Sequence, residues 1–282
     1  MELSSSRGAL WALRVFFVLL VAFLYLPLMV LMVFSFNSGD VSFPLQGFTL
    51  SWYQRAAQNP SLLAALQRSA IVATVTSIVA VALGVLASYA LVRRVFRGKS
   101  AFSALVFSPL VIPYLVFGIA LLVLFKALDK VLVALTGTYL DVGLHAVIVG
   151  HVVVALPYTI LTILPLLDRL SVTLEQAAHD LGASPWSTFW RVMFPLLMPA
   201  LVSAFLIAFT LSFDEYAIAS FLAGTQLTWP VFLFAQLRVP SQLPELVAVS
   251  TVILVVSIGL VVGAELGRQR SERRVVGAAQ TS

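Results

Sequence analysis

The feature that most constrains this chain is a series of long segments without a single charged residue. A helix needs about 20 mainly apolar residues to cross the hydrocarbon core of a bilayer. Six segments reach that length, at 15–39, 69–92, 100–125, 142–167, 192–213 and 246–264. We therefore predict an all-α, multi-pass integral membrane protein with six transmembrane helices.

The composition supports the same class. The chain is 61% hydrophobic and only 10% charged, with a mean hydropathy of +1.03, whereas soluble domains are nearer half apolar and a quarter charged. It has no cysteine, which excludes disulfides and thiolate metal sites. The pI near 9.8 could indicate nucleic-acid binding, but the basic residues form short clusters beside the apolar segments, as orientation signals do. We expect a lipid bilayer and no nucleic acid as partner.

Two segments allow a different count of spans. Residues 216–237 are apolar, but "GTQLTWP" within them favours a loop. We predict the end of the fifth span, an external turn and a short amphipathic or re-entrant piece, "VFLFAQL". The first apolar segment is too long for a signal peptide and no small-residue cleavage site follows it, which favours an uncleaved anchor.

Lysine and arginine fall unevenly on the two sides of a six-helix arrangement. With the N-terminus inside, 12 of the 17 lie on the cytoplasmic side, which favours both termini in the cytoplasm. We expect a cytoplasmic tail at 1–14, a permease-like membrane domain at 15–266 and a second tail at 267–282. The cytoplasmic set is Arg7, Arg14, Arg93, Arg94, Arg97, Lys99, Arg169, Arg191, Arg268, Arg270, Arg273 and Arg274; the external set is Arg55, Arg68, Lys126, Lys130 and Arg238.

The longest cytoplasmic loop, 168–199, has the local chemistry of two short helices. Thr173 can cap the first, with Gln176 as its capping-box partner, and Gly182 suits a left-handed terminating position. Ser184, followed by proline, can cap the second. The first helix carries two small residues, Ala177 and Ala178, which would let the surface of another protein approach it closely. The alternative is that the loop only connects two spans and is solvated.

The second helix of the loop, "WSTFWRVMF", carries an apolar face suited to the membrane interface. After it, prolines should restart the chain as the fifth span. The residues of the predicted face are Trp186, Phe189, Trp190 and Met193, and the prolines are Pro195 and Pro199.

This loop resembles the EAA loop of ATP-binding-cassette importer permeases, which reads Glu-Ala-Ala, three residues, Gly, nine residues, Ile, one residue, Leu-Pro. Here "QAAHDLG" is followed by nine residues and then "VMFP". Three positions depart from the motif: Gln176 replaces its first residue, Glu, Val192 replaces Ile and Phe194 replaces Leu. The nearest acid, Glu175, lies one position before the place of the motif glutamate. The spacing from Gly182 to the proline matches in full.

The resemblance implies a type I importer transmembrane domain, with its core at about 62–266, in the bacterial inner membrane. It implies that the loop 173–195 docks into a separate ATPase, so that the chain is a transport subunit and not an enzyme. Partners would be a second permease chain, for which the resemblance favours a different chain over a second copy of this one, together with two ATP-binding subunits that hold ATP and Mg and an external solute-binding protein. The chain itself would need no cofactor. The coupling residues implied are Glu175, Gln176, Ala177, Ala178, Asp180, Gly182, Ala183 and Pro195.

Other segments resemble the second membrane subunit of spermidine/putrescine importers. They are "FTLSWYQRAAQNPSLLAALQRSAIVA", "RRVFRGK", "SPLVIPYLVFGIALLVLF" and "LSFDEYAIASFLAG". The resemblance implies a polyamine as the solute. Related permeases carry other amines, amino-acid derivatives, opines or metal ions, and these stay open.

An acidic pair, Asp214 and Glu215, follows an apolar run in the fifth span. Counted from Ala200, Asp214 lies about 21 Å along a helix, where a carboxylate is costly unless it faces a cavity or a partner. Flanking aromatic faces can also attract ammonium groups. We therefore predict a transient cation site on the translocation path, formed by Asp214, Glu215, Thr210, Phe213 and Tyr216. Alternatively, the span ends near Phe213 and the acids lie in an external vestibule or pair with Arg238.

Prolines occur inside two spans, and we expect them to make packing bends rather than gating kinks; they are Pro109, Pro113, Pro157 and Pro165. His145 and His151 are six positions apart, which does not suit a metal pair, and we interpret them as satisfied polar residues. There is no G-x-x-x-x-G-K-[ST], H-E-x-x-H or G-x-S-x-G motif, so we expect no ATP site, metal site or catalytic residues in this chain. An ion-coupled secondary carrier and an intramembrane enzyme are the competing classes.

Overall fold

The computed structural model describes residues 7–39 and 44–259. Over these residues the regular structure is helical, apart from one isolated antiparallel bridge between Asn37 and Phe48, and the all-α prediction is confirmed. The chain divides into two units, one made of residues 1–60 and 235–258 and the other centred on residues 61–234. Each unit is described by itself.

The transmembrane segments correspond to the predicted ones. Within the described residues, five helical segments are long and apolar enough to cross a membrane, and a bent pair of helices makes a sixth if it counts as one span. The predicted end of the last span, 260–264, and the tail 267–282 lie outside the described residues. The five segments are Leu10–Phe34, Pro60–Arg93, Leu144–Arg169, Pro185–Phe213 and Pro240–Gly259; the bent pair is Lys99–Leu110 with Tyr114–Thr136.

The first unit contains α1 (Arg7–Phe34), α2 (Ser51–Gln58) and a helix at 243–259 that follows the short η3 (Pro240–Gln242). Its connecting loop folds around Asn37, whose side chain bonds the carbonyl of Pro44 and the N–H of Gln46. Trp52 Nε1 donates to the Asn37 carbonyl at 2.7 Å. These bonds satisfy polar groups that a loop would otherwise bury without partners.

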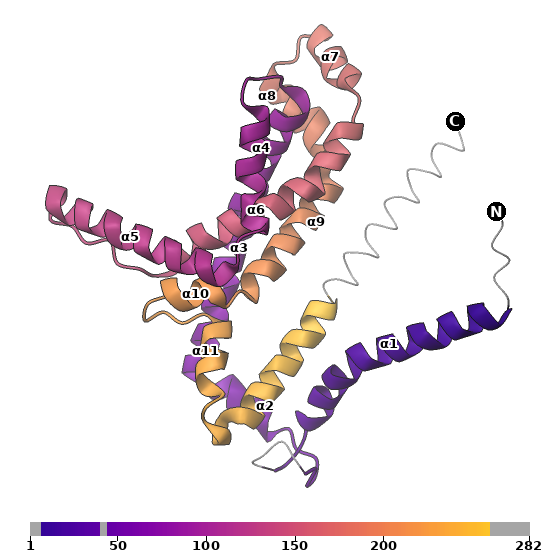
Figure 1. Ribbon diagram of the computed structural model, residues 1–282, viewed down its shortest axis with the longest axis vertical. Coiled ribbons are helices and arrows are strands. Elements are labelled where there is room, and N and C mark those ends of the chain that lie inside the picture. The colour runs from indigo at the N-terminus through magenta and orange to yellow at the C-terminus, as the bar shows by residue number, and fades with distance from the viewer. Residues whose placement is uncertain (1–6, 40–43, 260–282) are drawn as a thin grey trace. The chain divides into compact units, whose positions relative to one another are not determined.

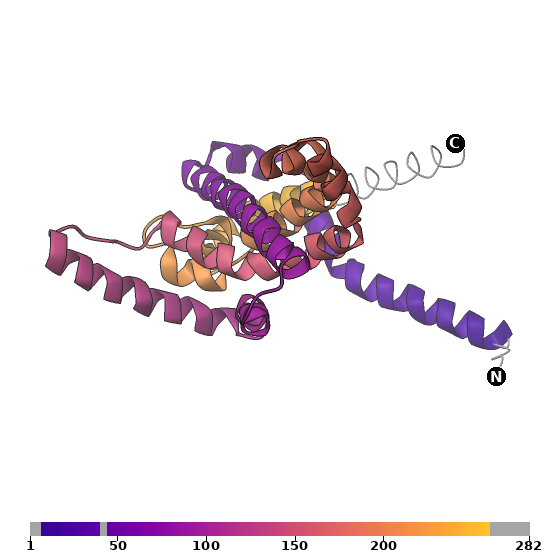
Figure 2. The same ribbon diagram turned by 90° about the horizontal axis from the view of Figure 1, so that it is seen from above.

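The second unit is organised around α6 (Leu144–Arg169) and α9 (Phe194–Phe213), which run side by side in both views (Figure 1, Figure 2). The long α3 (Pro60–Arg93) packs against them through small residues. A Cβ at Gly84 would overlap Thr159 Oγ1, and that hydroxyl donates to the Ala80 carbonyl at 3.0 Å. Glycine therefore allows α3 and α6 to approach closely at this crossing.

The third predicted span is broken. α4 (Lys99–Phe107) continues through η1 (Ser108–Leu110), and α5 (Tyr114–Thr136) then leaves at 109°. Pro113 precedes α5 with an extended ψ of 129°, and proline also disfavours a helical residue before it. The expectation of mere packing bends was wrong for this pair of prolines, whereas Pro157 and Pro165 lie inside the continuous α6. Figure 1 shows α5 pointing away from α6 and α9, next to α10.

The predicted cytoplasmic loop contains α7 (Val172–Asp180), whose N-cap is Ser171. Ser171 Oγ accepts from the N–H of Thr173 at 3.1 Å, so the predicted cap at Thr173 was wrong by two residues. The reason is that Val172 already has helical geometry. Gly182 has a φ of 82°, which confirms the left-handed position that ends the helix.

The second predicted helix of the loop is not separate from the fifth span. Ser184 caps α8 (Pro185–Thr188), as predicted, and accepts from the N–H of Ser187 at 3.3 Å. The chain then passes through a π-helical turn, η2 (Phe189–Met193), directly into α9. The predicted restart was wrong because η2 joins α8 to α9 without a break, and Pro195 follows this π-helical turn inside the continuous helix.

The doubtful segment 216–237 does not span a membrane as one helix. It forms the short α10 (Ala217–Leu222) and α11 (Trp229–Gln236), joined by a turn. The prediction of a short non-spanning piece after the fifth span is confirmed. α7 lies near one end of the α6–α9 pair, and α10 and α11 lie near the other (Figure 1).

Candidate functional site

Two features of the second unit carry the predicted site residues: α7 with its turn, and the break after α9. On α7 most side chains face outward, and Glu175 is buried. Gln176, Ala177 and Asp180 are exposed, and Ala178 is half-buried. The helix therefore presents a small, polar face to the outside and one carboxylate to the inside.

The carboxylate of Glu175 is held by α3. Arg93 Nε lies 2.8 Å from Glu175 Oε1, and Tyr89 donates its hydroxyl to Oε2 at 3.1 Å. Arg93 also donates through Nη2 to the carbonyl of Leu170 at 2.7 Å. The sequence places Arg93 and Tyr89 more than 80 positions from Glu175, and no local spacing rule could have found this cluster.

The turn after α7 contains two more of the predicted coupling residues, Gly182 and Ala183. The N–H of Gly182 donates to the His179 carbonyl, and that of Ala183 donates to the Ala178 carbonyl. Leu181 is 89% exposed at the tip. Pro195 lies apart from this turn, in the first turn of α9.

The predicted interfacial face of α8 and η2 is only partly correct. Trp186 and Trp190 are exposed and their rings meet edge to face at 5.5 Å. Met193 instead belongs to the core, packed with Leu167 and Leu197. The π-helical turn changes the residues per turn, which moves Met193 off the face of the tryptophans.

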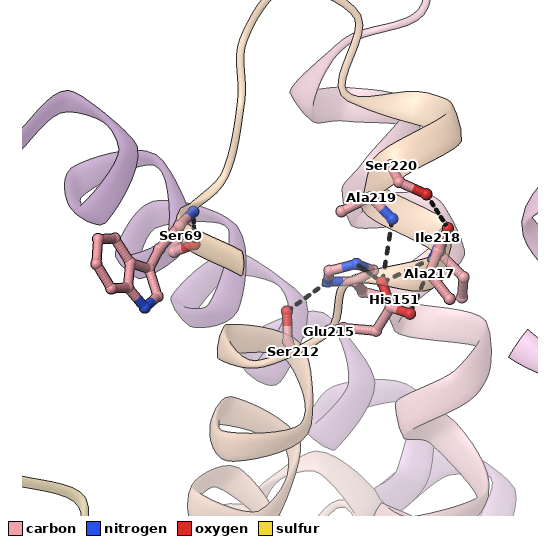
Figure 3. A network of polar contacts seen from close by, with 9 residues as sticks. Ser69, His151, Ser212, Glu215, Ala217, Ile218, Ala219 and Ser220 are labelled. Carbon is pink, nitrogen blue, oxygen red and sulfur yellow. Dashed lines mark hydrogen bonds and ion pairs between the residues drawn. The ribbon is translucent and has the colours of Figure 1, made fainter. Parts of the chain in front are cut away.

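The acidic pair lies where α9 ends. α9 stops at Phe213, and Glu215 turns back into the protein, where it accepts hydrogen bonds from the N–H groups of Ile218 and Ala219 at 2.9 and 3.0 Å. His151 contributes Nε2 at 3.1 Å from Glu215 Oε2. Figure 3 shows this cluster at the start of α10.

His151 completes the cluster from α6. Its Nδ1 lies 2.7 Å from Ser212 Oγ, so both ring nitrogens have partners, which confirms the interpretation of His151 as a satisfied polar residue. Within the second unit Glu215 thus pairs with His151. α9 ends at Phe213, as the alternative for the acidic pair had it, while Arg238 belongs to the other unit. His145 is exposed, with its ring 6.1 Å from that of Phe125.

Asp214 has a different environment from its neighbour. Its side chain is exposed, and in the described part of the chain no side chain or backbone group bonds its carboxylate. Thr210, one helical turn earlier, is also exposed and donates its hydroxyl to the Leu206 carbonyl at 2.9 Å. Phe213 stacks on Phe209 at 5.8 Å, while Tyr216 contacts Phe234 at 4.8 Å.

A small cavity lies beside the buried cluster. One of its walls is Tyr114 at the start of α5, which nothing in the local sequence pattern distinguishes. Its hydroxyl lies 3.4 Å from that of Tyr158. The lining residues are Tyr114, His151, Val154, Ala155, Leu211, Ser212 and Glu215.

Residues 80–276, which include α7 and the acidic pair, match the family "Binding-protein-dependent transport system inner membrane component". The chain belongs to this family. Among curated relatives, the spermidine/putrescine transport system permease protein PotC of Escherichia coli (strain K12) is 33% identical over 87% of this chain and 89% of its own. The putrescine transport system permease protein PotI of the same strain is 34% identical over 82% of each chain.

Solved structures of this family's fold agree. A chain of a bacterial ABC transporter that imports alginate superposes with a TM-score of 0.71, at 17% identity, over 93% of this chain and 98% of that one. A chain of the MetNI methionine ABC transporter gives 0.52, at 19% identity, over 77% and 95%. The predicted type I importer transmembrane fold is confirmed. This inner-membrane component is therefore an importer permease subunit and not an enzyme, and ATP hydrolysis belongs to a separate chain.

Proposed function

We propose that this permease subunit conducts a small polyamine, such as spermidine or putrescine, across the inner membrane. The observation that carries the proposal is the contrast at the end of α9: Glu215 is internally paired, while Asp214 presents an exposed carboxylate. A carboxylate near the membrane is stabilised by a group of opposite charge, and an ammonium group on the solute would supply it. The names of both curated relatives point to the same class of solute.

Aromatic side chains next to Asp214 support a cationic solute. Phe213 and Tyr216 flank the acid, and both are partly exposed. The faces of such rings attract cations, so a carboxylate with aromatic neighbours suits a chain of separated amines. Thr210 continues the polar side of α9 one turn away.

We place the α7 end of the second unit in the cytoplasm, as the distribution of basic residues predicts. The complete transporter then contains a second, different permease chain, two ATP-binding subunits and an external solute-binding protein. A solved relative of the fold was captured with a solute-bound periplasmic protein, which supports the last of these. ATP and Mg bind to the ATPase subunits.

Coupling in this proposal runs through the outward face of α7 and its turn. Gln176, Ala177, Asp180 and the Gly182–Ala183 turn meet the ATPase, with Ala178 partly covered beneath. Closure of the ATPase dimer moves this surface, and the two nucleotide states favour different pore conformations because each makes different contacts with α7.

The test is uptake by the complete transporter with Asp214→Asn and Glu215→Gln compared. Since a charged hydrogen-bonding contact contributes about 1.5–3 kcal/mol, D214N should raise the KM for spermidine by about tenfold or more, with basal ATP hydrolysis retained. E215Q should lower the amount of assembled protein and leave KM unchanged. Unaltered spermidine kinetics in D214N would refute the cation site, and inhibition of uptake by an opine, an amino-acid derivative or a metal ion instead of polyamines would reassign the solute.

A further inference from the structure

The junction between α7 and α3 is a buried polar cluster with one guanidinium at its centre. Arg93 Nε contacts Glu175 Oε1 at 2.8 Å, and Nη2 donates to the Leu170 carbonyl at 2.7 Å. Tyr89 adds its hydroxyl to the other oxygen of Glu175. Leu170 is the C-cap of α6, so Arg93 joins the ends of α3 and α6 to the first turn of α7.

Burial distinguishes this ion pair from an ordinary surface contact. The side chains of Arg93 and Glu175 are 9% and 12% exposed. Exposed ion pairs contribute little to stability, but removing one partner of a buried pair leaves the other charge without compensation. The planar guanidinium addresses two acceptors in fixed directions, which a lysine ammonium cannot do. The junction is therefore stiff as well as specific.

Most residues of α7 other than Glu175 are exposed among the described residues. Gln176 and Asp180 are exposed, whereas Glu175 lies on the inner side. A carboxylate used inside the chain in this way is not available to the outer surface. The helix is thus held from one side and open on the other.

α3 connects this junction to the opposite end of the second unit. Ser69, near the start of the helix, accepts from the N–H of Trp229 at 2.8 Å (Figure 3). Arg68, its neighbour, donates to the Leu227 carbonyl. At 1.5 Å per residue, roughly 36 Å of continuous helix separates Ser69 from Arg93. One rigid element therefore contacts α7 at one end and the turn before α11 at the other.

We propose that Arg93 is a positioning residue for ATP-driven transport, because its bonds to Glu175 and Leu170 make α7 and α3 move as one body. This inference rests on the proposed function, since it takes α7 as the surface that the ATPase moves. When the ATPase displaces α7, α3 moves with it and carries the motion to the turn at 227–229, which contacts the start of α3. Glu175 acts from beneath the coupling surface and does not contact the ATPase.

The first test measures solute transported per ATP hydrolysed in the complete transporter. Arg93→Gln and Glu175→Gln should keep the ATPase subunits bound at the wild-type level, yet lower transport per ATP at least about threefold. Arg93→Lys should lie between them and wild type, and the double reversal R93E/E175R should recover part of the loss. Arg94→Gln and Asp168→Asn, which alter exposed charges beside the junction, are the matched controls and should behave as wild type.

Two outcomes would overturn the inference. Wild-type transport per ATP in both R93Q and E175Q would show that the junction transmits nothing. Loss of the ATPase subunits from E175Q alone would show that Glu175 contacts the ATPase directly. A wild-type complex that contains no ATPase subunit would instead refute the proposed function, so the two failures are distinguishable.

The second test measures the distance between α3 and α7 directly, first in a protein whose junction residues are unchanged. The chain has no cysteine, so nitroxide labels can be attached at Val95→Cys and Val172→Cys, both exposed and next to the ends of α3 and α7. The distance between the labels should be the same in nucleotide-free and ATP-bound transporter, and should spread in E175Q. A distance that changes with nucleotide in the protein without junction variants would overturn the proposal.

Discussion

Glu215 and Asp214 are adjacent, yet the fold gives each carboxylate a separate task. Glu215 accepts from two backbone N–H groups and His151, whose second nitrogen meets Ser212. These bonds hold the start of α10 against α6 and fix the direction in which the chain leaves α9. Asp214 remains exposed at that bend. The buried acid therefore positions the exposed one.

Removal of the buried carboxylate should destabilise the protein. In Glu215→Ala, His151 and the N–H groups of α10 lose their shared acceptor inside the core, and leaving a buried donor without a partner costs about 1–3 kcal/mol. We expect a clear fall in the Tm of the detergent-solubilised transporter, followed by intrinsic fluorescence, with a smaller fall for E215Q. Asp214→Ala is the matched control and should melt as wild type; an unchanged Tm in E215A would contradict the role assigned to Glu215.

The helices illustrate what sequence can predict in a membrane protein. Charge-free segments of sufficient length locate the spans because lipid excludes charge wherever the helix lies. They do not locate the ends: α3 extends from Pro60 to Arg93, well beyond its apolar segment at 69–92, since a helix continues into water without penalty. The break at Pro113 and the continuity through Pro195 were both mispredicted, because proline allows either outcome and neighbouring packing decides between them.

The site was predictable only where its pattern is local. The glycine turn at Gly182 and the cap at Ser184 follow from short-range rules and were found. Glu175 with Arg93, and Glu215 with His151, bring together helices far apart in the sequence, and no spacing within one segment encodes them. The two acids also looked equivalent in the sequence, because the partner that distinguishes Glu215 from the exposed Asp214, His151, lies on another helix.

At the scale of helix packing, the α3–α6 crossing makes a direct prediction. A methyl group at Gly84 would displace the hydroxyl of Thr159 and weaken its bond to Ala80, and overpacking of this kind costs about 1–3 kcal/mol. Gly84→Ala should lower the Tm and the amount of assembled transporter. Gly259→Ala should be neutral or slightly stabilising, because no atom of the described residues lies within 4 Å of the added Cβ. Equal effects of the two substitutions would contradict the close approach.

For the whole molecule, the fold and family define a permease that itself carries out no chemistry. The two sites that we propose lie at opposite ends of the second unit: the α7 surface at one end, and Asp214 with the short helices α10 and α11 toward the other. α3 contacts the α7 region through Arg93 and the α11 region through Ser69. A secondary carrier could also use an acid such as Asp214, but it would have no use for a docking surface on α7.

The most direct test is accumulation of radiolabelled spermidine in proteoliposomes that contain the complete transporter and its solute-binding protein. We predict accumulation against a gradient that requires ATP on the side of α7, is inhibited by vanadate and is strongly reduced by D214N. Accumulation driven by a proton or sodium gradient in the absence of the ATPase subunits would contradict the account.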